Sequence, residues 1–292
     1  MTAEREKVIN ISDSSGNDRF VPLQRYLVLY IDVVGQSKKL ENLQAKFLNP
    51  FETQLGFPTK TINDIQDAFK DVFAVRKSFL KSLEQARESY FKRQGRVFKV
   101  EPKIIFASDG LFIWVKLPDE NSLDELVALM ITMNALAASQ MTLFSREIFF
   151  KAGACISYGF EHPDFKDDYY GPGLARVAYL EEKAPFPCVL LDRNVKTLIK
   201  SFFVYAQEIK NQPIQEHCLQ LLDFIGDEIE IESQNGIPNP YVFFPYRRFH
   251  KKMPEAYDEV ITSLEQQSQR LDLPSKIRDK YKRLLKLINS SI

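Results

Sequence analysis

One apolar run that ends in a single carboxylate constrains the fold of this chain more than any other stretch. Residues 25–34 read Arg-Tyr-Leu-Val-Leu-Tyr-Ile-Asp-Val-Val. A near-continuous apolar run of this length predicts a strand that is covered on both faces. Gly35 follows in a loop of small residues, and a basic helix is predicted from Lys38. Asp32 is therefore expected near the end of a buried strand, beside a loop whose backbone can approach a ligand closely.

A carboxylate next to the start of a helix suits a divalent cation that is held together with a polyphosphate. Hard cations take oxygen ligands, and the backbone N–H groups at a helix N-terminus bind phosphate. Strand, carboxylate and loop also occur together in many α/β proteins that lack this role. Asp32 on its own therefore leaves both interpretations open.

A second carboxylate, Asp109, is predicted in a tight turn. Residues 107–110 read Ala-Ser-Asp-Gly between two β-rich runs, 103–106 and 111–115. Asp-Gly between such runs is a strong signal for a hairpin. If the hairpin lies beside the first strand, both carboxylates project into one cleft, where they can bind two cations about 3.5–4 Å apart. The alternative is that Asp32 caps a strand and Asp109 only serves the turn.

The composition is that of a folded protein and disfavours one class of partner. Hydrophobic residues make up 45% of the 292 residues and charged residues 27%, and 39 basic residues balance 39 acidic ones. A protein that grips nucleic acid nonspecifically usually carries a basic excess, so no nucleic-acid partner is expected. Residues 1–20 contain no apolar signal core and are interpreted as part of a short polar leader, residues 1–24.

Neither a membrane span nor a thiol or imidazole metal site is predicted. The longest apolar helical stretch, residues 126–138, is interrupted by Thr132 and Asn134 and is too short to cross a bilayer. The three cysteines form no C-x-x-C pair and are interpreted as buried thiols of a reducing compartment, which predicts a cytoplasmic protein. The histidines, His162, His217 and His250, are scattered without metal-ligand spacing.

The order of the predicted elements indicates an α+β fold. Strands are expected at 25–33, 103–106, 111–115, 149–159, 188–192 and 241–244, and helices at 61–92, 122–145, 174–183, 254–270 and 275–289. Residues 202–209 fit a strand or a helix. The order predicts a ferredoxin-like βαββαβ sheet with helices on one face, plus C-terminal helices. A basic cluster at 246–252 is interpreted as a solvated face, although one of its arginines could reach a triphosphate.

Four ordered motifs make residues 25–198 resemble the catalytic domain of class III nucleotidyl cyclases. The first family motif, F-x-D-I-x-x-F-T, corresponds to residues 30–37, and the second, G-D, to residues 108–111. The third, R-x-G-x-x-x-G followed by D-V-W-G, corresponds to residues 151–159 followed by 168–171. The fourth, V-N-x-A-x-R, corresponds to residues 174–179. The resemblance implies a palm-type cyclase sheet for residues 25–198. Residues 199–292 would then be a C-terminal strand and helical extension of the same domain.

The resemblance also implies a reaction. Asp32 and Asp109, with the Val33 carbonyl, would ligate two Mg²⁺ or Mn²⁺ ions. The triphosphate would be held by the backbone N–H groups of Val34, Gly35, Gln36 and Ser37. The ribose 3′-hydroxyl would attack the α-phosphorus and expel pyrophosphate, and positioning and charge neutralisation would supply most of the acceleration. The family further implies a homodimer, with the active site formed where two chains meet.

The sequence departs from the family at the transition-state residues. The family's Asn and Arg fall on Ala175 and Tyr179, neither of which can replace them. Arg176 is the natural substitute as a phosphate-facing cation. The alternative is that Arg176 is a solvated charge on a helix.

The base-reading positions depart as well, since they align with Ile105 and Asp168. An apolar Ile105 removes a hydrogen-bonding partner that purine readout needs, while Asp168 can accept a hydrogen bond from an N–H group. Tyr26, Tyr169 and Tyr170 could stack on a smaller base, or they could be ordinary packing tyrosines.

This combination resembles the bacterial pyrimidine cyclases of the Pycsar anti-phage systems. The resemblance implies a cyclase that makes cyclic UMP or cyclic CMP, with UTP favoured as substrate, and a separate effector protein that responds to the product. Two alternatives stay open at this stage. One is an adenylate or guanylate cyclase with altered base readout, and the other is a silent module that only binds nucleotide or dimerises.

Overall fold

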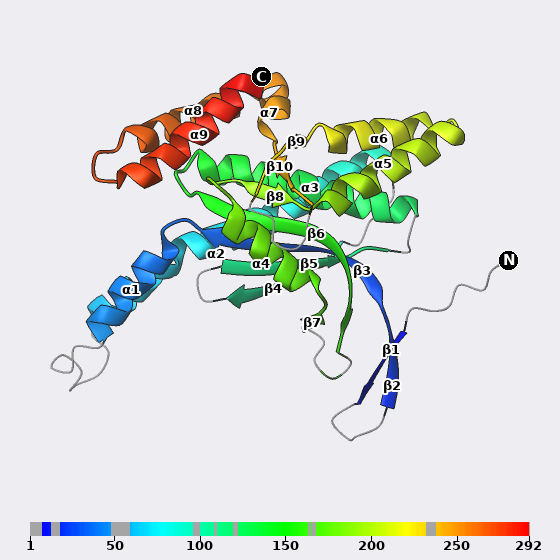
Figure 1. Cartoon of the computed structure of the whole chain (residues 1–292), viewed down its shortest axis with the longest axis horizontal. Helices are drawn as coiled ribbons and strands as arrows, with labels where there is room; N and C mark the ends of the chain where they lie inside the picture. The colour runs from blue at the N-terminus through cyan, green and yellow to red at the C-terminus, as the bar shows by residue number, and fades with distance from the viewer. Residues whose placement is uncertain are drawn as a thin grey trace.

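The structure is a computed structural model of the chain, and it describes residues 8–12, 18–47, 59–95, 100–107, 110–118, 122–162, 164, 168–231 and 238–291. Ser108 and Asp109 lie outside the described residues. A large central sheet is flanked by helices, and a small two-stranded sheet projects from it near the N-terminus (Figure 1). The two strands of that projection are β1 (Val8–Ser12) and β2 (Asp18–Pro22), within the stretch predicted as a polar leader.

Eight strands form the central sheet. They are β3 (Gln24–Val33), β4 (Pro102–Ala107), β5 (Gly110–Lys116), β6 (Phe150–Glu161), β7 (Tyr169–Tyr170), β8 (Val189–Leu191), β9 (Ile225–Glu228) and β10 (Tyr241–Phe243). The order across the sheet is β4-β5-β3-β6-β8-β10-β9, and β7 pairs with β6. Among the described strand pairs of this sheet, β6 with β8 is parallel and the others are antiparallel. The apolar run of β3 therefore lies between two neighbouring strands, β5 and β6, as its sequence predicts.

The described helices lie between and after these strands. They are α1 (Gln36–Phe47), α2 (Thr59–Gln94), α3 (Leu123–Phe144), α4 (Gly173–Lys183), α5 (Arg193–Glu208), α6 (Gln212–Leu222), α7 (Tyr246–Lys252), α8 (Pro254–Gln269) and α9 (Ser275–Ser291). The predicted α+β class is confirmed, and so are the predicted helices, each to within about two residues. Residues 202–209 fit either state; residues 202–208 belong to α5, and Ile209 is its C-cap.

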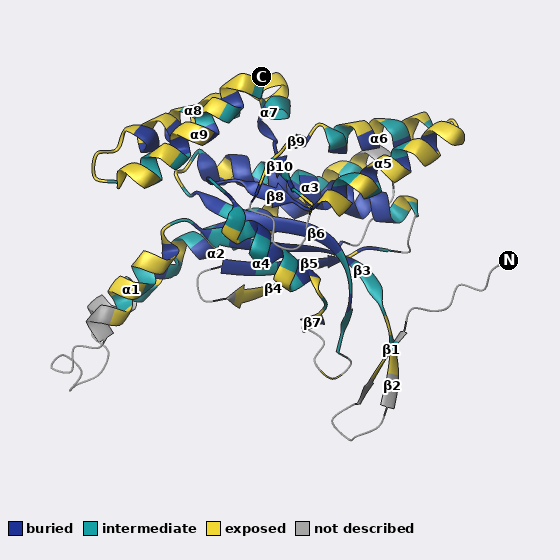
Figure 2. Ribbon diagram, in the orientation of Figure 1, coloured by how far each residue is buried: buried dark blue, intermediate teal, exposed yellow. Residues whose placement is uncertain are grey.

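Both faces of β3 are covered, but by different helices. Leu27, Leu29, Ile31 and Val33 lie in the large core with buried residues of α2 and α3. Tyr26 and Val28, on the other face, pack with Val177 of α4. The expectation that helices cover only one face is therefore wrong. An apolar run that is buried on both sides needs a second layer, and α4 supplies it in front of the sheet (Figures 1 and 2).

Helix α3 is the central helix of the larger core. Ser122 caps its N-terminus, where its hydroxyl accepts a hydrogen bond from the Glu125 N–H at 3.1 Å. Glu125 is itself buried and accepts a hydrogen bond from Arg25 of β3 at 2.6 Å, so an ion pair ties the first turn of α3 to the central strand.

One described helix, α3, has the length and hydropathy of a membrane span. It has 22 residues, so the expectation that this stretch is too short to cross a bilayer is wrong. In its most apolar 18-residue window, 83% of the residues are buried inside the structure, which is the pattern of a core helix.

The C-terminal region packs onto the same core. Leu284 and Ile288 of α9 belong to the core cluster that also contains Val33 of β3. Helix α5 runs across position 198, the predicted end of the first segment. The division into residues 25–198 and 199–292 therefore remains a prediction about function and marks no break between elements.

Candidate functional site

Asp32 occupies the next-to-last position of β3, between two neighbouring strands. In the pairing register its Cα lies opposite Gly110 of β5 on one side and Lys151 of β6 on the other. Directly paired residues project to the same face of a sheet, so Asp32 and Lys151 share the face that α4 covers. The Asp32 side chain is half-buried, and its Oδ1 atom is buried. The Lys151 ammonium group donates to Glu181 of α4 at 3.0 Å.

Asp109 lies outside the described residues, but its neighbour Gly110 is the first residue of β5. Gly110 pairs with Ala107 across the predicted hairpin and with Asp32 on β3, so the hairpin lies beside the first strand as expected. A Cβ atom at Gly110 would lie 2.6 Å from the Ile31 carbonyl oxygen and 2.7 Å from the Tyr30 ring. Only glycine fits this close approach, and Asp109 is bonded to it.

The loop after β3 turns sharply at Gly35 and leads directly into α1. Gly35 has a φ of +85°, a conformation that glycine adopts without strain. The Val34 N–H donates to the Phe149 carbonyl at 2.9 Å, so this amide is already used within the chain. Helix α1 begins at Gln36, and the first N–H groups of a helix have no partner within it. The amides of Gln36 and Ser37 are the first two of α1, at the end of a helix that attracts anions.

Gln36 anchors this loop to the core. Its side chain is fully buried, and its Nε2 atom donates to the Ala68 carbonyl of α2 at 2.6 Å. Lys39, one turn further along α1, forms an ion pair with Asp71 of α2. These two contacts fix the start of α1 relative to β3. The sequence predicts the loop but gives no sign that Gln36 points inward, because an isolated glutamine is normally exposed.

The donor set at Asp32 fits a hard divalent cation that is bound together with substrate. Within the described residues no group of three or more His, Cys, Asp or Glu side chains forms a metal cluster. Mg²⁺ is usually held by one or two carboxylates plus substrate phosphates rather than by an all-protein cage. One half-buried carboxylate beside the N-terminal amides of a helix matches that second type of site.

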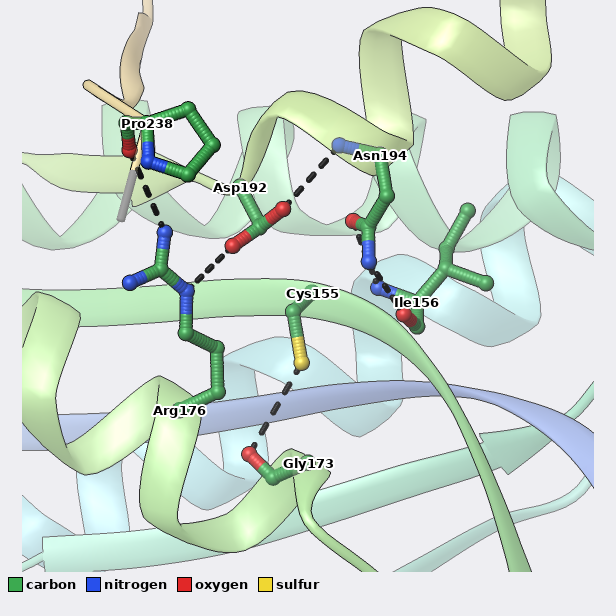
Figure 3. A network of polar contacts seen from close by, with 7 residues as sticks. All are labelled: Cys155, Ile156, Gly173, Arg176, Asp192, Asn194 and Pro238. Atoms are coloured by element: carbon green, nitrogen blue, oxygen red, sulfur yellow. Dashed lines mark hydrogen bonds and ion pairs between the residues drawn. The ribbon is translucent and has the colours of Figure 1, made fainter. Parts of the chain in front are cut away.

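Arg176 belongs to a polar network that joins α4 to the start of α5 (Figure 3). Its Nε atom pairs with the Asp192 carboxylate, and its Nη2 atom donates to the Pro238 carbonyl at 3.5 Å. Asp192 also caps α5 by accepting from the Asn194 N–H at 3.0 Å. Only 17% of the Arg176 side chain and 12% of the Asp192 side chain are exposed. Arg176 is therefore not the solvated helix charge of the alternative, and within one chain its guanidinium group is bound to Asp192.

Asp192 and Asn194 are the residues that sequence reasoning missed here. The Asn194 side chain makes two hydrogen bonds to the backbone of Ile156 (Figure 3). Its Oδ1 atom accepts from the Ile156 N–H at 3.2 Å, and its Nδ2 atom donates to the Ile156 carbonyl. An Asp directly before a helix is a signal for an N-cap and would have found Asp192. Nothing local in the sequence points to Arg176 as its partner.

Ile105 and Tyr170, both predicted to contact the base, have exposed side chains. Ile105 lies on β4 opposite Phe112, which stacks on Tyr30 with ring centroids 4.4 Å apart. Tyr170 is 43% exposed, stacks on Phe160 and donates through its hydroxyl to Asp168 at 3.4 Å. The structure thus joins Asp168 and Tyr170 directly, while Ile105 lies on a separate strand.

Tyr26 and Tyr169 are packing tyrosines. They are 1% and 5% exposed, and their rings meet edge to face with centroids 5.0 Å apart. A Cβ atom at Gly159 would lie 2.3 Å from the Tyr169 ring, and one at Gly171 would lie 2.5 Å from its hydroxyl. Those glycines therefore make room for Tyr169 beneath α4.

No protein-family model matches the sequence, and no curated protein matches it. Solved cyclase structures are similar over much of the chain. The catalytic core of a rhodopsin-guanylyl cyclase in complex with ATPalphaS is 11% identical, with a TM-score of 0.37 over 75% of this chain and 94% of that one. The guanylate cyclase domain of RhGC from Catenaria anguillulae, in complex with GTP, is 11% identical with a TM-score of 0.32 over the same shares, 75% and 94%.

A third similar structure is a class III adenylyl cyclase-like ATP-binding protein from Pseudomonas aeruginosa. It is 9% identical, with a TM-score of 0.38 over 86% of this chain and 60% of that one. At these identities and TM-scores the similarities assign neither a family nor an activity to this chain. The functional argument therefore rests on the residues themselves.

Proposed function

We propose that this chain is a metal-dependent nucleotidyl cyclase that converts UTP to 3′,5′-cyclic UMP and pyrophosphate. The observation that carries the proposal is the register of β3 and β5, in which Asp32 lies opposite Gly110, the residue bonded to Asp109. This register supports a shared site for the two carboxylates that the sequence singles out. Strand β3 ends at Val33, and α1 begins after the two-residue loop Val34-Gly35, so the phosphate-binding end of a helix lies at the same end of β3 as Asp32.

Different groups of the chain would hold the cations and the phosphates. Asp32 and Asp109, with the Val33 carbonyl, would hold two Mg²⁺ or Mn²⁺ ions, which neutralise phosphate charge and favour ionisation of the ribose hydroxyl when bound. The amides of Gly35, Gln36 and Ser37 would donate to the triphosphate oxygens. Val34 is the weakest of the four predicted donors, because its N–H already bonds to Phe149.

A pyrimidine base fits the exposed residues better than a purine. Ile105 offers no hydrogen bond to a base edge, while Asp168 can accept from the N3–H of uracil. Tyr170 presents an exposed ring to stack on the base, whereas Tyr26 and Tyr169 are buried. CTP is the closest alternative substrate, because Asp168 can also accept from an exocyclic amine. A purine would need a further polar partner at the position of Ile105.

The wider role that we propose follows from the Pycsar resemblance. The protein would act as a homodimer in the cytoplasm, with no membrane or nucleic-acid partner, and its cyclic nucleotide would activate a separate effector protein in anti-phage defence. A dimer would also allow Arg176 of one chain to serve the phosphates bound by the other. That role requires Arg176 to exchange Asp192 for a phosphate oxygen.

One observation favours a second function, that of a silent nucleotide-binding module. Arg176 is bound to Asp192 and largely covered, and Ala175 and Tyr179 stand where the family has its transition-state residues. A chain whose candidate cation is fixed in a structural ion pair would bind a triphosphate without turning it over.

Incubation with nucleotides separates these functions. Purified protein is mixed with ATP, GTP, CTP or UTP and Mn²⁺, and products are resolved by mass spectrometry. Cyclic UMP as the main product supports the proposal. Cyclic CMP as the main product would replace UTP by CTP as the proposed substrate. A cyclic purine contradicts the argument from Ile105. Absence of any cyclic product, with UTP binding detected by calorimetry, favours the silent module.

A further inference from the structure

The C-terminal helix α9 packs against the end of the sheet that carries Asp32. The Tyr281 ring of α9 meets the Phe149 ring edge to face, with centroids 4.9 Å apart. Phe149 directly precedes β6, and its carbonyl accepts a hydrogen bond from the Val34 N–H at 2.9 Å. Val34 belongs to the loop between β3 and α1, so α9 lies close to the backbone that the proposed function assigns to the triphosphate.

Helix α9 is strongly basic. Its buried face attaches it to the larger core. Within Ser275–Ser291 the single acidic residue is Asp279, against these basic residues: Lys276, Arg278, Lys280, Lys282, Arg283 and Lys286. Most of the cations are exposed, as on an ordinary amphipathic helix, whereas Lys280 and Arg278 are half-buried. The charge of Lys280 is thus held partly away from water.

Lys280 belongs to a cluster of charged groups beside the candidate site. Burial lowers the pKa of the Lys280 ammonium group, and the positive charges of Lys151 and Lys276 lower it further. The carboxylate of Glu181 acts in the opposite direction and raises this pKa. Charges shift the pKa of a group in this way when they lie close to it. Lys151 is the register partner of Asp32, so the cluster adjoins the carboxylate that the proposed function assigns to metal ions.

The cluster holds more positive than negative charge. Lys151 and Glu181 pair with each other at 3.0 Å, and only 17% and 12% of their side chains are exposed. Neither Lys276 nor Lys280 forms an ion pair within the part of the chain that the structure describes. Like charges that are held close together repel, and a bound anion offsets this repulsion. An anion is therefore the ligand that this cluster favours.

We propose that Lys280 binds a phosphate group of the triphosphate, so that the C-terminal helix α9 contributes to the nucleotide site. The inference rests on the proposed function, which places the triphosphate beside Asp32 and the start of α1. A lysine ammonium group binds phosphate as a point charge at the end of a long, flexible side chain. Residues 199–292 would then supply part of the site as well as extend the domain.

Isothermal titration calorimetry of the full-length chain with inorganic tripolyphosphate and Mg²⁺ tests this proposal. Tripolyphosphate carries linked phosphate groups but has no ribose or base, so its binding depends neither on base recognition nor on turnover. We expect Lys280→Gln to weaken tripolyphosphate binding about fivefold or more, because it removes a charged contact to phosphate. Lys280→Arg keeps the charge and should bind within about twofold of the native chain.

The matched control is Lys282→Gln, which removes the same charge from an exposed side chain two residues further along α9. Residues two apart on a helix do not share a face, so this variant should bind tripolyphosphate within about twofold of the native chain. Because Lys280 lies among like charges, we expect Lys280→Gln to keep or raise the melting temperature in the absence of anion. Loss of a structural contact would lower it.

The proposal is overturned if the native chain shows no saturable binding of tripolyphosphate, if Lys280→Gln binds it as the native chain does, or if Lys280→Gln and Lys282→Gln weaken binding equally. It is also overturned if the weaker binding of Lys280→Gln comes with a lower melting temperature. The nucleotide assay keeps this result apart from the proposed function. Cyclic UMP formation with native binding in Lys280→Gln would reject the role of Lys280 and leave the reaction standing. Binding of tripolyphosphate that depends on Lys280, in a chain that forms no cyclic nucleotide, would support Lys280 and reject the reaction.

Discussion

Gly153 shows at the scale of one residue how α4 meets the sheet. This residue of β6 pairs with Tyr30 of β3, on the face that α4 covers. A Cβ atom there would lie 2.1 Å from the Val177 carbonyl oxygen and 2.8 Å from Leu180 Cβ, both on α4. The backbone of α4 thus rests on glycine, and a larger residue would push the helix away.

We expect Gly153→Ala to lower the free energy of unfolding by about 3 kcal/mol, at the upper end of the usual cost of overpacking a core. Urea unfolding followed by circular dichroism measures this. Gly226→Ala is the control, because its nearest neighbour would be 3.1 Å away and is a side-chain atom. An unfolding midpoint for Gly153→Ala that equals that of Gly226→Ala would contradict the packing described here.

All three cysteines are buried free thiols, as their spacing in the sequence predicts. Burial raises the pKa of the Cys155 and Cys188 thiols to about 12, and that of Cys218 to about 11. The thiolate is the reactive form, and it is scarce wherever the pH lies well below the pKa. We expect the native protein at pH 8 to resist an aromatic disulfide reagent, and all three thiols to react once guanidinium chloride unfolds it. Rapid labelling of any cysteine in the native protein would contradict this burial.

The residues of the candidate site were predictable to different degrees. The positions of Asp32 at a strand end and of Gly35 in a turn can be predicted from the local sequence, because the apolar run and the glycine are close together in the chain. The inward position of Gln36 and the pairing of Arg176 with Asp192 depend on contacts between distant segments. A single sequence does not record such contacts, so Arg176 was assigned only a phosphate or a solvent role.

At the scale of elements, the Arg176–Asp192 pair joins α4 to the first turn of α5. Arg176→Ala leaves Asp192 without its cation, and we expect a loss of about 1–3 kcal/mol in the free energy of unfolding, less than for a fully buried pair because both side chains keep some exposure. Arg176→Lys should recover part of this loss. Urea unfolding of both variants measures it.

Arg193→Ala is the matched control, because Arg193 also pairs with a carboxylate, that of Glu228, but at the surface. It should change the stability little, since exposed ion pairs contribute little. If Arg176→Ala is as stable as the native chain, the ion pair has no structural role, and a role for Arg176 at the phosphates gains weight.

Most elements were predictable because their apolar periodicity is long and regular. The 36-residue α2 repeats the pattern over many turns, whereas the 22-residue α3 is apolar on most of its faces. The type of both helices is therefore predictable, and only their ends differ from the prediction. Residues 202–209 lacked that clarity, because eight residues with mixed polarity fit either period. The position of α4 on its own face of the sheet followed from no local pattern, although burial of β3 on both faces required a second layer.

At the scale of the whole molecule, the strand order places Asp32 and the larger core on opposite faces of one sheet. The larger core includes the C-terminal helices. Strand alternation explains this arrangement, because neighbouring residues of β3 point to opposite faces.

The most direct test of the central claim is the rate of cyclic nucleotide formation by two carboxylate variants. Asp32→Asn and Asp109→Asn keep the shape of each side chain and remove its charge. We expect each variant to lower kcat/KM for UTP with Mn²⁺ by about 100-fold or more. This is the usual loss of rate when one group that stabilises the charge of the transition state is removed. Asp258→Asn, at an exposed position on α8, should stay within about twofold of the native chain. A native rate in either Asp32→Asn or Asp109→Asn would contradict the account.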